Sequence, residues 1–134
     1  DVPLAAKYHH ERLDGRGYPD GLYDREIPYI AKVVNLADSF DAMTTDRPYK
    51  ARRPAIDVVD DMRRNAGKQF APELVVAFLR GVLRELKSET KDRRFRRLLG
   101  REDMEAEGLM PAISDALNEL EPTSSLTYIA TRSN

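Results

Sequence analysis

Two adjacent histidines followed by a glycine-rich turn are the residues of this chain best suited to chemistry. His9 and His10 are the only histidines among the 134 residues, and the segment from 11 to 21 contains three glycines and a proline. On a helix, adjacent side chains project about 100° apart, so one backbone segment can serve two neighbouring metal ions. Glycines let the chain bend sharply and approach a ligand closely. The segment therefore predicts part of an active site rather than a packing element.

Two aspartates further along the chain are candidates for the same site. Asp38 follows Val34 by four residues and Asp41 follows Ala37 by four, which predicts that both carboxylates continue the apolar stripe of a helix. A buried carboxylate is costly unless a metal or a cation meets it. Two interpretations stay open: a carboxylate bonded to a cap or an arginine, or a metal ligand shared with the histidines. Nitrogen and carboxylate ligands without sulfur suit Fe, Mn or Zn.

A basic pair follows this helix. Arg47 and Lys50 flank Pro48 and Tyr49. Arginine offers a fixed fork for phosphate oxygens, and lysine offers a mobile point charge. By itself such a pair is commonly a solvated surface. Shortly after candidate metal ligands, it predicts a clamp for a phosphate-bearing substrate.

Apolar residues at helical spacing, bounded by proline and glycine, predict an all-α fold. The expected helices cover residues 2–10, 28–44, 54–65, 72–86 and 110–120, with loops at 11–26 and 46–53. Beyond residue 87 the sequence becomes a charged stretch with one further short helix. This change predicts a boundary between residues 86 and 91, which divides the chain into a helical unit, 1–86, and a charged helical tail, 87–134.

The composition excludes several classes of function. Without cysteine, the chain has no disulfide, no thiolate catalysis and no zinc–thiolate site. Its net charge of −1 favours no partner that is a nucleic acid or an anionic membrane, and the basic run at 91–97 lies among glutamates and is interpreted as a solvated helix face. The longest apolar run, 74–79, is too short to span a bilayer. No export signal opens the chain, so a cytoplasmic location is expected.

The motifs as a set resemble HD-GYP domains. The run from His9 to Gly21 is similar to the signature loop of that family, and Ala37-Asp38 with residues 40–44 and 47–50 is similar to the segment that follows it. Residues 67–72 are similar to the family's next block, although Ala71 stands where an aspartate is common. The resemblance covers residues 1–84. It implies an all-α, HD-domain-like helical bundle.

The resemblance also implies a function. Active HD-GYP domains are bacterial phosphodiesterases that hydrolyse cyclic di-GMP with two or three metal ions, in most cases Fe or Mn, with Zn as a further candidate. The residues that match the family's metal ligands are His9, His10 and Asp38. Tyr18 matches a position beside the substrate, so Asp38 and Tyr18 are the expected catalytic positions.

The basic pair gains a role from the same resemblance. Arg47 and Lys50 match the residues that hold substrate phosphate in this family. The replacement at Ala71 is expected to weaken a local hydrogen bond or helix cap rather than the metal site. Cyclic di-GMP is therefore the expected partner of the pocket that these residues form.

One departure from the family is pronounced. The family takes its name from a His-Asp pair upstream of the tandem histidines, and this chain contains neither that dipeptide nor a third histidine. We therefore expect the chain to correspond to the C-terminal half of such a domain. Alone, it is expected to bind one divalent ion weakly and to hydrolyse cyclic di-GMP negligibly.

Two further expectations concern partners. The family's signature loop is also associated with docking to GGDEF-type diguanylate cyclase domains, so a non-catalytic interaction module is the alternative function, and a regulatory remnant that binds nothing small is a third. A half-domain exposes the apolar residues around Val33, Val34, Leu74 and Phe78, and exposed apolar patches favour association. We expect either a homo-oligomer, most simply a dimer, or tail helices that fold back over these residues.

Overall fold

The protein is helical throughout the part described by the computed structural model, residues 3–46, 48–88, 99 and 107–121. The elements are α1 (Leu4–Tyr8), the 3₁₀ helix η1 (Asp24–Glu26), α2 (Tyr29–Thr44), α3 (Ala55–Asn65), α4 (Pro72–Lys87) and α7 (Leu109–Leu120). No strand occurs within these residues, only isolated bridges. The all-α prediction is confirmed.

Prolines begin three of the helices. Pro28 and Pro54 are the N-cap residues of α2 and α3, and Pro72 is the first residue of α4. Proline suits these positions because its φ is already that of a helix. It also lacks an N–H, and the N–H groups of the first turn have no carbonyl partner within the helix in any case. Ala71, the N-cap of α4, makes no side-chain cap hydrogen bond, as expected of alanine at that position.

The first helix is shorter than the sequence predicted. It ends at Tyr8, so His9 and His10 lie in the turn that follows and not on the helix. The two imidazoles therefore do not diverge as they would on a helix: their ring centroids are 4.0 Å apart.

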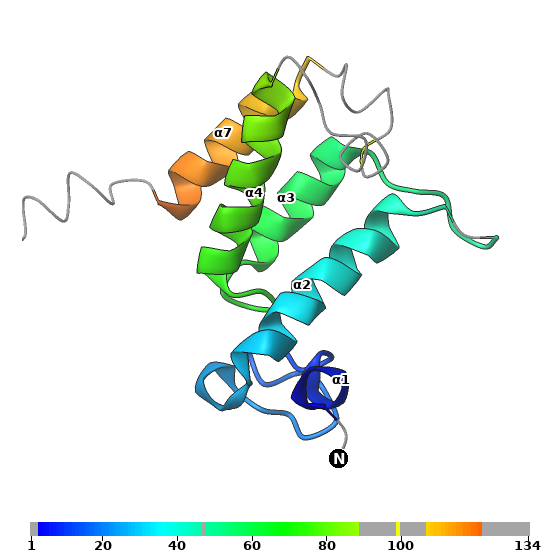
Figure 1. The fold of residues 1–134 in the computed structure, drawn as a ribbon, viewed down its shortest axis with the longest axis vertical. Helices are drawn as coiled ribbons and strands as arrows, with labels where there is room; N and C mark the ends of the chain where they lie inside the picture. Colours follow the sequence, from blue (N-terminus) through cyan, green and yellow to red (C-terminus); the bar gives the residue numbers. More distant parts are fainter. Residues whose placement is uncertain (1–2, 47, 89–98, 100–106, 122–134) are drawn as a thin grey trace, which may run out of the picture.

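The helices gather into two parts joined by α2 (Figure 1). At one end of the molecule, α3, α4 and α7 lie side by side, and α7 packs against both of the others. At the other end, α1 packs against α2 beside the loop that carries the glycines. The candidate site lies at this second end.

A single large core joins α2 to the three helices beside it. Its fully buried side chains include Met62 of α3, Leu79 of α4 and Ile113 of α7. A smaller cluster under the glycine-rich loop consists of Leu13, Ile27, Ala31 and Ala71. This smaller cluster holds the loop against the start of α2.

The buried face of α2 differs from the predicted one. The helix buries Leu36 and Phe40 in the core, whereas Asp38 and Asp41 are exposed. The prediction that both aspartates continue the buried stripe is wrong. Asp38 is two residues from both Leu36 and Phe40, which places it about 200° around the helix from each. Its carboxylate consequently needs no cation to offset burial.

The helix of the tail covers part of the core. α7 buries Leu109, Ile113 and Ala116 in the main cluster, and Phe78 packs against that cluster while partly exposed. On α2, by contrast, Val33 remains 37% exposed. The charged stretch before α7 lies largely outside the described residues, and the division at residues 86–91 stays a prediction.

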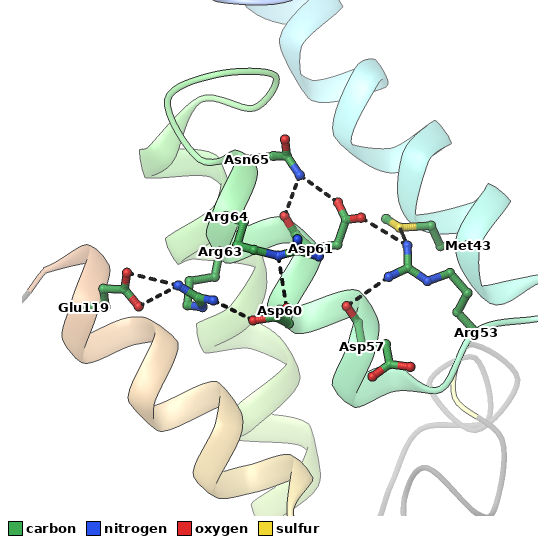
Figure 2. A network of polar contacts seen from close by, with 9 residues as sticks. All are labelled: Met43, Arg53, Asp57, Asp60, Asp61, Arg63, Arg64, Asn65 and Glu119. Carbon is green, nitrogen blue, oxygen red and sulfur yellow. Dashed lines mark hydrogen bonds and ion pairs between the residues drawn. The ribbon is translucent and has the colours of Figure 1, made fainter.

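Polar contacts along α3 link it to its neighbours (Figure 2). Arg63 bonds to Asp60 on its own helix and reaches both carboxylate oxygens of Glu119 on α7, each at 3.1 Å. Arg53, just before α3, donates to Asp61 at 3.0 Å. These ion pairs are at least partly exposed, so their contribution to stability is small.

Removing apolar contacts from α7 should matter more than removing its ion pair. Ile113→Ala is expected to lower the free energy of unfolding by about 2–5 kcal/mol, because the side chain is fully buried in the core. Arg63→Ala should shift the urea midpoint only slightly. Equal shifts for the two variants would show that the core contacts do not hold α7.

Candidate metal and substrate site

The backbone of the turn after α1 fixes the ring of His9. Its Nδ1 lies 3.0 Å from the carbonyl oxygens of both Ala5 and Ala6. A carbonyl can only accept, so Nδ1 carries a proton, and in the neutral imidazole Nε2 carries the lone pair. Metal-binding imidazoles are prepared in this way, with the second nitrogen bonded to a carbonyl.

The free nitrogen of His9 faces Asp38. Nε2 is 3.6 Å from Asp38 Oδ2. In the neutral imidazole both atoms are acceptors, so a cation between them is stabilising. Metal bonds to a nitrogen and to an oxygen are each about 2.0–2.2 Å long. Two such bonds are together longer than this separation, so one ion placed beside the line that joins the two atoms can reach both. Within the described residues, no three His, Asp or Glu side chains form a metal-binding group. His9 and Asp38 therefore supply two donors, one nitrogen and one oxygen, of the several that a metal ion needs.

The second histidine stacks on the loop. The ring of His10 lies parallel to that of Tyr18, with centroids 4.7 Å apart and planes at 17°. The Tyr18–Pro19 peptide bond that follows is cis. The structure thus brings Tyr18 to the histidines, with His10 between Tyr18 and His9.

A buried carboxylate holds the loop in shape, and the sequence analysis did not identify it. Glu11 is only 2% exposed. It accepts three backbone N–H bonds, from Asp20 and Gly21 at Oε1 and from Leu22 at Oε2, over 2.7–3.0 Å. Charge-assisted bonds of this kind are among the stronger ones in proteins. One signal in the sequence could have pointed to Glu11: it directly precedes a glycine-rich turn, whose backbone N–H groups need acceptors.

An arginine ties the loop to the rest of the fold. Arg12 bonds both oxygens of Asp14 at 3.1 Å and donates to Gln69 Oε1 at 3.2 Å. Gln69 in turn donates to Ser39 Oγ on α2 at 3.2 Å. The hydrogen bond from Arg12 lowers the pKa of the Asp14 carboxyl below its ordinary value. These contacts connect three segments that are far apart in sequence. No local sequence motif predicts them.

The side chains of the loop and of α2 line a common pocket of about 480 Å³. Its polar lining includes the two histidines, Arg12, Tyr18, Asn35 and Asp38. Lys50 is exposed and does not line this pocket, and Arg47 lies outside the described residues. The structure therefore brings together four of the six predicted site residues.

Comparison with known proteins identifies related sequences. A family model described as HD domain matches residues 1–74. A Thermotoga maritima protein named cyclic di-GMP phosphodiesterase is 50% identical over 72 residues, which cover 54% of this chain and 20% of the relative. A cyclic di-GMP phosphodiesterase response regulator of Xanthomonas campestris is 45% identical over 78 residues, 58% of this chain and 21% of the relative.

A third relative is named for a different substrate. It is a 3′3′-cGAMP-specific phosphodiesterase of Vibrio cholerae, 39% identical over 69 residues, 52% of this chain and 15% of the relative. The chain thus spans about a fifth or less of the length of these curated relatives. Within the described residues, no helix combines the length and apolar character needed to cross a bilayer.

Proposed function

Because this chain belongs to the HD domain family, we propose that it forms part of a phosphodiesterase that hydrolyses cyclic di-GMP in bacterial second-messenger signalling. The resemblance to HD-GYP domains is confirmed by the family match and by relatives named cyclic di-GMP phosphodiesterases. HD-domain phosphodiesterases generally depend on divalent metals. We propose Fe or Mn for this site, with Zn as a further candidate.

One observation carries the proposal. His9 Nε2, freed by the bonds at Nδ1, faces Asp38 Oδ2 at 3.6 Å in the wall of a 480 Å³ pocket. The backbone holds Nδ1 of this ring and turns Nε2 toward a carboxylate beside the pocket, an arrangement that suits a cation shared by the two groups. When bound, a divalent ion supplies stabilisation for charge that develops on phosphate oxygens.

The remaining side chains receive roles around that pair. We propose His10 as a further metal ligand and Asp38 and Tyr18 as the catalytic positions, with Tyr18 stacked on His10 where it can also contact the substrate. Lys50, exposed after α2, and Arg47 are proposed to hold substrate phosphate, since a guanidinium and an ammonium both bind phosphate oxygens. The proposed site of action is the bacterial cytoplasm.

The proposal is tested by hydrolysis in the full-length protein. After loading with Mn²⁺ or Fe²⁺, it is expected to hydrolyse cyclic di-GMP, to lose activity with EDTA, and to regain it on metal addition. 3′3′-cGAMP, tested in parallel, defines the substrate class. A metal-loaded protein that hydrolyses neither dinucleotide would contradict the proposal.

Exposed aromatic side chains support the alternative function. Tyr18 and Tyr23 on the loop are 60% and 62% exposed, a surface suited to docking a GGDEF-type partner without hydrolysis. Binding of such a partner by a protein inactive in the assay above would favour this function. The homo-oligomer is likewise a proposal, supported by exposed Ile30 and Val33 on α2 and measurable by sedimentation.

A further inference from the structure

Asn35 bridges the metal-binding turn and the helix that carries Asp38. It lies on α2, is 7% exposed, and donates from Nδ2 to the backbone oxygen of His9 at 2.6 Å. Because a carbonyl only accepts hydrogen bonds, the amide NH₂ must face His9. The amide oxygen of Asn35 is thereby turned away from this partner.

That amide oxygen has no partner. Asn35 Oδ1 is buried without a hydrogen-bond partner in the part of the chain that the structure describes. A buried acceptor without a donor is destabilising, and native proteins contain few of them. Asn35 also lines the pocket that contains His9 and Asp38. Asn35 thus makes the hydrogen bond to His9 while its amide oxygen is left without a partner.

The hydrogen bond from Asn35 ties His9 to α2, whereas the bonds from His9 to Ala5 and Ala6 tie it to α1. The backbone N–H and the ring of His9 bond to Ala5 and Ala6, which belong to the preceding helix. Asn35 alone of these partners lies on α2, three residues before Asp38. Residues three apart are neighbours on a helix surface, so the bond links the position of His9 to that of Asp38.

We propose that Asn35 is a positioning residue of the metal site. Its amide holds the peptide of His9 against α2, and so keeps Nε2 opposite Asp38 Oδ2. The inference rests on the proposed function in one respect, the assignment of His9 and Asp38 as metal ligands. Its effect on the ring of His9 is independent of any metal.

The test compares Asn35→Ala with Thr44→Val in the full-length protein. Thr44 is a matched control, because it is equally buried on the same helix and donates to a backbone oxygen, that of Phe40, at 2.7 Å, outside the pocket. Asn35→Ala is expected to weaken Mn²⁺ binding about 10–100-fold, the range found when a group that orients a metal ligand is removed. Thr44→Val should lower the thermal midpoint and leave the Mn²⁺ affinity unchanged.

A metal-free measurement accompanies the affinity. In NMR spectra of the histidine rings, the His9 signals are expected to be single and sharp in the unmodified protein and in Thr44→Val, and broadened or doubled in Asn35→Ala. Asn35→Ser, which keeps a shorter donor, should fall between the two and gives a second variant if the alanine protein does not fold. Excess Mn²⁺ should restore kcat in Asn35→Ala, because the ligands themselves remain.

The outcomes separate the inference from the proposed function. Unchanged His9 signals and Mn²⁺ affinity in both Asn35 variants would overturn the positioning role while leaving the phosphodiesterase proposal intact. If the unmodified protein binds no Mn²⁺ and hydrolyses nothing, the proposed function fails, and the metal-free ring spectra still decide whether Asn35 holds His9.

Discussion

Replacing Asp38 by alanine is expected to remove bound metal and hydrolytic activity together from the full-length protein. The carboxylate faces His9 Nε2 at 3.6 Å and is exposed to the pocket rather than used by the protein fold. Metal stabilisation of phosphate charge contributes several kcal/mol, and about 1.4 kcal/mol corresponds to a tenfold change in rate. A fall in kcat on the order of 10³-fold or more is therefore expected, with metal content measured on the same preparation.

Arg47→Ala is the contrasting variant. If Arg47 binds phosphate and not metal, its removal should raise KM while the metal content stays unchanged, and kcat falls as well if the contact strengthens in the transition state. A hydrogen bond to a charged group contributes about 1.5–3 kcal/mol, which corresponds to roughly a tenfold to hundredfold loss in kcat/KM. Metal loss in Arg47→Ala, or full metal content in Asp38→Ala, would show that the two roles are assigned wrongly.

The helices of this protein are predictable because residues at their ends, above all prolines, set their boundaries locally. Pro28, Pro54 and Pro72 mark the starts of α2, α3 and α4, and proline has the same preference whatever the rest of the fold does. The start of α7 at Leu109 was also predicted to within a residue. Only α1, five residues long, is notably shorter than predicted.

The side of α2 that packs into the core was not predictable in the same way. Its sequence offers two candidate apolar faces, one through Val33 and Ala37 and one through Leu36 and Phe40. The core formed by α3 and α4 selects the second, and this choice depends on segments remote in sequence. The argument from burial for Asp38 was wrong, and its exposed place beside His9 supports the proposal of a metal ligand instead.

The supporting residues of the site were missed for a related reason. Glu11, Asn35 and Gln69 act through contacts 9 to 57 residues away along the chain, whereas sequence patterns report on neighbours. The tandem histidines were conspicuous because their residue type is rare here. The residues that bond to the turn and the loop are common residue types, and only the folded chain shows which neighbours they bond.

The glycine between the histidines and the cis proline should be intolerant of any side chain. A Cβ atom at Gly17 would lie 2.4 Å from the carbonyl oxygen of His10, 2.5 Å from the backbone nitrogen of Arg12 and 2.6 Å from Glu11 Cα. All three are backbone atoms of the segment that carries the histidines, so no side-chain rotation relieves the contact. Gly17→Ala must displace this segment, and the displacement moves His10 from its place beside Tyr18 and His9.

Gly81 provides the matched control for that substitution. It lies within α4, and a Cβ there would meet no atom within 4 Å. Gly81→Ala is therefore expected to raise the free energy of unfolding by about 0.5–1 kcal/mol, since alanine loses less backbone entropy than glycine in a helix. Gly17→Ala is expected to lower it by about 1–3 kcal/mol, the range for overpacked sites, and to weaken Mn²⁺ binding. The same chemical change thus has opposite signs at two positions, measurable by urea unfolding of both variants. Unfolding free energies that rise in both, with Mn²⁺ affinity retained in Gly17→Ala, would contradict the close approach of the loop to the tandem histidines.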